Sequence, residues 1–231
     1  MTDRFEDQEL NIVESDVALK PTPRVPGQRN PEKTRRAILD AATEEFIAKG
    51  FAGASVNEIA DRANVNKRML YHYFGKKDEL YVAVLERVYF SLRSAQVQKL
   101  KVSDLSPTQA IEVLIKFTWN YYLDHPEFLN LMMIENMQQG KYALQSERIS
   151  GANVPLRELM QEVVKRGQQD GVFRKDVDSF QLYLTIAALG ATHIATRHTL
   201  SGLAGEDLTT PEQLDIRVRH IVDVVLGYLR P

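Results

Sequence analysis

Hydrophobic residues recur along most of this chain at the spacing of an α-helix. Between residues 78 and 100, apolar side chains stand at every fourth position, as at Leu80, Val84, Val88 and Leu92. A similar stripe closes the chain, and no window alternates polar and apolar residues as a half-buried strand would. The pattern predicts an all-α fold with about nine helices.

Capping residues, glycines and prolines indicate where these helices begin and end. The predicted helices cover residues 31–50, 55–63, 66–74, 106–124, 126–138, 153–171 and 178–200, with two more starting near 78 and 210. Residues 139–153 fit either a loop or a short helix, and residues 201–209 fit a loop.

Two short helical patterns lie close together between Ser55 and Leu80. Ser55, with Glu58 three positions on, is typical of a capping box that opens the first helix. Asn64 is a residue type that tolerates the left-handed backbone of a sharp turn. The second helix can turn a few apolar residues inward, namely Leu70, Tyr73 and Phe74. This layout predicts a helix-turn-helix, a unit that places its second helix in a DNA major groove.

The outward face of that second helix carries groups suited to reading DNA. Lys67 and Arg68 could reach guanine acceptors, and Met69 could meet a thymine methyl group. Asn66 could cap the helix or contact a base, while Tyr71 and His72, one turn later, suit phosphate contacts. The alternative is a solvated basic face with Tyr71 packed in the core.

Charge is distributed unevenly along the chain, although the formal net charge is only −2. Residues 1–19 carry −5, residues 20–77 carry +6, and the remainder carries −3. A basic segment inside an acidic chain suits local phosphate binding.

Composition and motifs argue against a disulfide-bonded, secreted, membrane-spanning or enzymatic protein. The chain has 231 residues and no cysteine, which excludes disulfides and thiolate catalysis. No window has the apolar length of a membrane span, and the acidic start is unlike a signal peptide. We therefore expect a cytoplasmic protein without a membrane segment. No phosphate loop, nucleophile motif or acid–base pair predicts an enzyme or a bound cofactor.

Residues 34–85 resemble the N-terminal DNA-binding domain of the TetR family of bacterial transcriptional regulators. The matching marks are TRRAILDAATEEF, KGF, ASVNEIADRANV and LYHYFGKKDEL, in one order and spacing. The resemblance implies backbone contacts from the following residues: Thr34, Arg35, Ser55, Tyr71, His72 and Lys77. The family often has Gly at the position of Asn64, and a small residue and Ser or Thr at those of Arg68 and Met69, so these two imply a different base preference.

The predicted organisation has three parts: an arm over residues 1–30, a DNA-binding domain over 31–77 and a helical body over 78–231. The arm is rich in proline and partly basic, which excludes a helix or a central strand at its end. Its basic residues (Lys20, Arg24 and Arg29) could lie along phosphates or reach a minor groove, or the arm could be a disordered tail.

The body concentrates aromatic and methionine residues between Phe117 and Met137, a composition that suits an adaptable apolar pocket. The candidates for binding a partly apolar small-molecule effector are Trp119, Tyr122, Met133 and His193. Each of them could instead fill the core. His193 and His198 are five residues apart and do not share a helix face, so no metal site is predicted.

The helix around residues 187–191 is apolar on nearly all sides, so other helices must bury it on nearly all sides. By resemblance to the family, it pairs with the last helix to form a homodimer, and two reading heads on a two-fold axis require a palindromic operator. The sequence thus favours a homodimeric repressor that a small molecule releases from double-stranded DNA. The alternatives are a regulator that recruits a protein partner, and an activator.

Overall fold

The computed structural model describes residues 30–99 and 102–231, and every regular element in those ranges is a helix. The elements are α1 (Pro31–Gly53), α2 (Val56–Arg62), α3 (Lys67–Phe74), α4 (Lys77–Lys99), α5 (Pro107–Asp124), α6 (Pro126–Met137), η1 (Ala143–Gln145), α7 (Glu147–Ala152), α8 (Val154–Gln169), α9 (Ser179–Ala204) and α10 (Pro211–Leu229). The all-α prediction is confirmed. The predicted arm, apart from Asn30, lies outside the described residues.

Side-chain caps fix most of the predicted helix starts. Ser106 and Gln109 form both halves of a capping box at α5. The side chains of Asn30, Asp178 and Thr210 accept backbone N–H groups at the starts of α1, α9 and α10. Each cap satisfies donors that have no partner within the first turn of the helix, so the chain starts its helices where the sequence predicts.

Two boundaries differ from the prediction. The regular part of α1 ends at Gly50, whose φ of 67° breaks the helix, but one further turn follows to Gly53. Residues 139–153 contain the short helix α7, one of the two predicted possibilities. Residues 201–204 are helical, because α9 continues until Gly205 adopts a left-handed φ of 73°.

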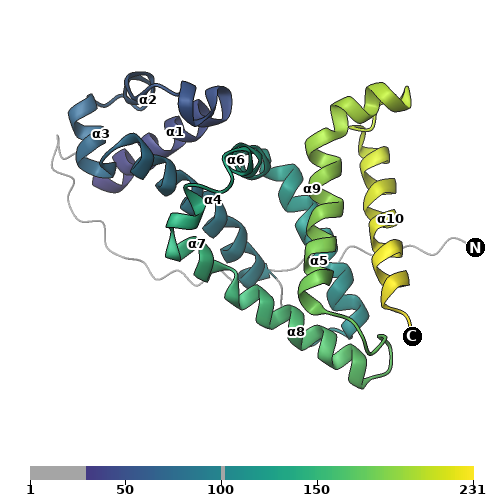
Figure 1. Ribbon diagram of the computed structural model, residues 1–231. Coiled ribbons are helices and arrows are strands. Elements are labelled where there is room, and N and C mark those ends of the chain that lie inside the picture. The colour runs from purple at the N-terminus through teal and green to yellow at the C-terminus, as the bar shows by residue number, and fades with distance from the viewer. Residues whose placement is uncertain (1–29, 100–101) are drawn as a thin grey trace, which may run out of the picture.

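Helix α4 runs from the N-terminal domain into the body (Figure 1). Its predicted apolar stripe is buried: Leu80, Val84, Val88 and Leu92. One end of α4 packs against α1 and α3, and the rest packs against α6, α7 and α8 in the body. A displacement of α4 within the body would therefore reach the small N-terminal domain directly.

The body is a bundle in which α5 is central, with contacts to α6, α8, α9 and α10. Helices α9 and α10 lie side by side at the far side from α1–α3 (Figure 1). None of the described helices is both long and apolar enough to cross a membrane.

Candidate DNA-reading surface

The predicted turn between α2 and α3 is present and is closed by backbone and side-chain hydrogen bonds. Asn64 has a φ of 53°, in the left-handed region that an asparagine tolerates. The amide of Val65 donates to the carbonyl of Ala60 at 3.0 Å. The side chain of Asn66 then accepts from the amide of Met69 at 2.8 Å, so Asn66 caps α3.

Helix α3 has one buried and one exposed face. Leu70 and Phe74 are buried, and Tyr73 is partly buried against them. The opposite face presents four of the predicted contact residues to solvent, namely Lys67, Arg68, Tyr71 and His72, while Met69 is partly buried. Tyr71 is 42% exposed, so it is not a core residue. The ammonium of Lys67 lies 5.8 Å from the Tyr71 ring centroid, which groups the cation and the phenol on one surface.

The flanking residues implied by the family resemblance have local partners. The Thr34 hydroxyl donates to the carbonyl of Asn30 at 3.2 Å. The Arg35 guanidinium lies 4.9 Å from the ring centroid of Phe74, which holds an exposed cation beside α3. Lys77 donates to the carbonyl of Ala52 at 3.3 Å and lies over Phe51, and burial lowers its pKa. Arg35 is thus the residue of these three that remains exposed.

Glu45 on α1 binds the start of α2 and the side chains around it, a role that the sequence did not predict. Its carboxylate is fully buried and accepts from the amide of Ser55 at 3.1 Å. It also pairs with Lys49 at 3.1 Å and with Arg62 at 3.6 Å. In a capping box the Ser55 amide would donate to Glu58. Here that amide donates to Glu45, and Glu58, the predicted partner, pairs with Lys49. The sequence signal for this role is that Glu45, a charged residue, lies on the apolar stripe of α1.

We expect Glu45→Gln to destabilise the protein by about 1–3 kcal/mol, because it removes a buried charged acceptor from Ser55, Lys49 and Arg62. Burial acts to raise the pKa of Glu45, but the Ser55 amide and the two cations outweigh it and lower the pKa overall. The carboxylate therefore stabilises the fold above its unfolded pKa, and this contribution is lost as the pH falls through the lower folded value.

Urea unfolding at neutral and acidic pH measures both effects. The matched control is Glu44→Gln, which removes an exposed carboxylate that also pairs with Arg62; it should cost less than about 1 kcal/mol. Equal losses for the two variants would contradict the role given to Glu45.

Three of the four predicted effector residues meet in the body. Trp119 and Tyr122 on α5 and His193 on α9 are buried, and the rings of Trp119 and His193 lie 5.5 Å apart. Gly190 of α9 lies beside both aromatic rings of α5, since a Cβ there would stand 3.5 Å from Tyr122 and 3.8 Å from Trp119. Met133 is 46% exposed, because it lies about 200° around α6 from the buried Leu131. It is a surface residue, outside this group.

His193 is the polar member of the group. Its Nε2 atom is buried without a hydrogen-bond partner. Burial lowers the pKa of His193, and the positive charges of Arg217 and Arg197 lower it further. A neutral imidazole with an unpaired nitrogen can form one hydrogen bond with a bound molecule, as donor or acceptor.

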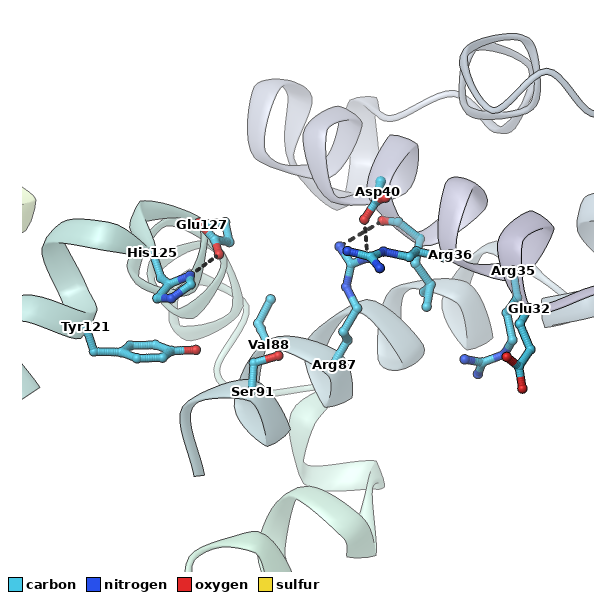
Figure 2. Close-up of a pocket in the computed structure, with 11 residues that line it drawn as sticks. Glu32, Arg35, Arg36, Asp40, Arg87, Val88, Ser91, Tyr121, His125 and Glu127 are labelled. Atoms are coloured by element: carbon cyan, nitrogen blue, oxygen red, sulfur yellow. Dashed lines mark hydrogen bonds and ion pairs between the residues drawn. The ribbon is translucent and has the colours of Figure 1, made fainter. Parts of the chain in front are cut away.

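A separate cleft lies between the N-terminal domain and the body (Figure 2). It measures about 650 Å³ and is lined from α1, α4, α5 and the start of α6. Figure 2 shows Arg87 reaching Asp40 on one side and His125 beside Glu127 on the other. None of the four predicted effector residues lines it. The cleft lies where the N-terminal DNA-binding domain meets the body.

Arg87 joins α4 to α1 on one side of this cleft. From α4 its guanidinium donates to Asp40 at 2.5 Å, to the Leu39 carbonyl at 3.2 Å and to the Thr43 hydroxyl at 2.5 Å, all on α1. Three bonds from one planar group fix α1 to α4 in orientation as well as distance.

Comparison with known proteins agrees with this geometry. Residues 38–84 match the family described as bacterial regulatory proteins, tetR family, and residues 107–225 match the tetracyclin repressor-like C-terminal domain. The chain is 35% identical over 199 residues to the HTH-type transcriptional repressor NicS of Pseudomonas putida, covering 86% of this chain and 93% of NicS.

A second relative and a solved structure extend the likeness. The HTH-type transcriptional repressor SCO4008 of Streptomyces coelicolor is 31% identical over 161 residues, which cover 70% of this chain and 78% of SCO4008. The crystal structure of the putative transcriptional regulator SCO4942 from Streptomyces coelicolor aligns with a TM-score of 0.65 at 22% identity, over 86% of this chain and 99% of that one. The chain thus belongs to the tetR family of bacterial regulatory proteins and is a DNA-binding transcriptional regulator.

Proposed function

We propose that the protein is a homodimeric repressor that binds a palindromic operator and leaves it when a small molecule binds in the body. The observation that carries the proposal is the exposed face of α3, where Lys67, Arg68, Tyr71 and His72 stand together over a capped helix-turn-helix. Such a face supplies both donors for base edges and groups for phosphates.

The exposed apolar residues of α9 and α10 support a dimer. Each helix exposes large apolar side chains one turn apart: Phe180 and Leu184 on α9, and Val224 and Tyr228 on α10, each 42–46% exposed. Neighbouring exposed apolar residues on two packed helices are typical of an interaction surface. A two-fold axis through α9 and α10 would set two copies of α3 on successive major grooves.

The connection from the body to α1 supports release by an effector. A molecule that binds among the body helices favours one position of α4 over another, because α4 packs on α6, α7 and α8. Arg87 would carry that change to α1 through Asp40 and Thr43. A ligand with different affinities for the two positions shifts the DNA-bound population.

A gel-shift titration on the DNA upstream of the protein's own gene tests this function. We expect one retarded complex, containing two protomers per palindromic site, and loss of that complex when the effector is added from a metabolite panel. Failure to retard any palindromic fragment at low salt would contradict the proposal.

Thermal unfolding separates the effector-responsive repressor from a regulator that recruits a protein partner. A metabolite that binds the folded state raises the melting temperature, whereas a regulator without a small-molecule site gives no shift across the panel. A promoter fusion distinguishes repression from activation by the sign of the change when the regulator is deleted.

A further inference from the structure

Arg93 on α4 is a buried cation inside the body. It is only 8% exposed, and its guanidinium contacts three neutral acceptors. Nε donates to Asn153 at 2.8 Å, one terminal nitrogen to Gln96 at 2.6 Å, and the other to the hydroxyl of Tyr183 at 2.9 Å. These bonds come from α4, α9 and the start of α8, so they fix the guanidinium between the helices.

Within residues 30–99 and 102–231, Arg93 forms no ion pair with a carboxylate. The nearby tyrosines do not supply a negative charge. Burial raises the pKa of Tyr89 and of Tyr122, and the positive charge of Arg93 only partly opposes that rise. Both phenols are therefore neutral at physiological pH.

A buried charge without a counter-charge is costly, and buried charged groups in proteins are normally paired. Arginine matches a carboxylate especially well, since its planar fork can form two parallel hydrogen bonds with the two oxygens. Three donors of the five are used by neutral groups, which leaves two N–H groups for a ligand.

We propose that the effector is a small apolar carboxylate whose negative charge pairs with Arg93. The surroundings indicate the rest of the molecule. Phe128 stacks on Tyr122 with ring centroids 5.8 Å apart and meets Tyr89 edge to face at 5.4 Å. An aromatic ring attached to the carboxylate would find aromatic partners there.

Tyr183 stands where such a molecule would enter. Its hydroxyl accepts from Arg93, and its side chain also lines a cleft of about 60 Å³ between α8 and α9, together with Met160 and Phe180. That cleft is too small for a ring-bearing acid, so we expect Tyr183 to rotate away and the carboxylate to replace its hydroxyl on the guanidinium.

This inference rests on the proposed effector response, and matched ligands test it on the protein without DNA. The probes are benzoate, phenylacetate and 2-naphthoate, each compared with its primary amide by thermal unfolding at equal concentrations. We expect at least one acid to raise the melting temperature by about 2 °C or more and its amide to leave it unchanged. No shift with any of the acids, or equal shifts with an amide, would overturn the inference.

Two variants place the binding at Arg93. Arg93→Gln should abolish the shift caused by the acid. Because that variant could also unfold, Gln96→Glu provides the second test: it puts an internal carboxylate at the atom that now accepts from Arg93 at 2.6 Å. We expect Gln96→Glu to melt higher than the wild type without ligand and to bind the acid at least about tenfold more weakly.

The control is Gln169→Glu, which adds the same charge at an exposed position at the end of α8. It should leave both the melting temperature and the response to the acid unchanged. Unaltered binding of the acid by Gln96→Glu would overturn the role of Arg93. An acid that binds through Arg93 without releasing DNA would leave the carboxylate site at Arg93 standing but refute release of the repressor through that site. Release by neutral molecules alone would support the repressor mechanism and overturn the carboxylate effector.

Discussion

Replacing Arg68 with alanine is expected to weaken binding to the operator by about 5- to 150-fold, the effect of losing one bidentate base contact worth about 1–3 kcal/mol. Arg68 is exposed in the first turn of α3, and the Asn66 cap holds that turn in place. Because the contact is to a base edge, the loss should be large on the operator and small on unrelated DNA.

Competition gel shifts with operator and random duplexes measure this difference. The matched control is Arg219→Ala, which removes the same charge from an exposed position on α10 and should change neither affinity. An equal loss on both duplexes for Arg68→Ala would mean that Arg68 contacts phosphates and does not read a base.

Introducing a charge at Leu184 is expected to convert the protein to a monomer and to lower operator affinity by about 100-fold or more. Leu184→Asp places a carboxylate in the middle of the exposed apolar surface of α9, which a symmetric dimer would bury twice. A monomer then binds each half-site separately and loses the advantage of two linked reading heads, which is about 10²- to 10⁴-fold.

Sedimentation velocity and gel shifts report the two effects. Leu144→Asp is the control, since Leu144 is 78% exposed in η1, away from α9 and α10. A Leu184→Asp protein that remains dimeric would exclude this face as the interface and require another arrangement of the two heads.

Much of the fold follows from local signals in the sequence. The caps at Ser106, Asp178 and Thr210 act within one turn of their own helices, so reading a short window is enough to find them. The exposed face of α3 was predictable for the same reason. The helix has only eight residues, and the helical repeat of its apolar residues is enough to decide which side chains are buried.

The rest depends on contacts between distant segments. Glu45 caps Ser55 from another helix, and Arg93 finds Tyr183 ninety residues away, so neither pairing has a local pattern. Met133 is similar in type to its buried neighbours, and only the packing of α6 places it on the surface. The cleft beside Arg87 is formed by four helices and has no signature in any one of them.

Protection of guanines from dimethyl sulfate tests the central claim, that α3 reads the major groove, most directly. The reagent methylates N7 of guanine, the acceptor that Arg68 or Lys67 would occupy. We predict two symmetric protected guanines about 10 base pairs or a multiple of that apart, and renewed reactivity at one guanine in each half-site with Arg68→Ala. Full reactivity of every guanine at saturating protein, or protection that survives replacement of both Lys67 and Arg68, would contradict the account.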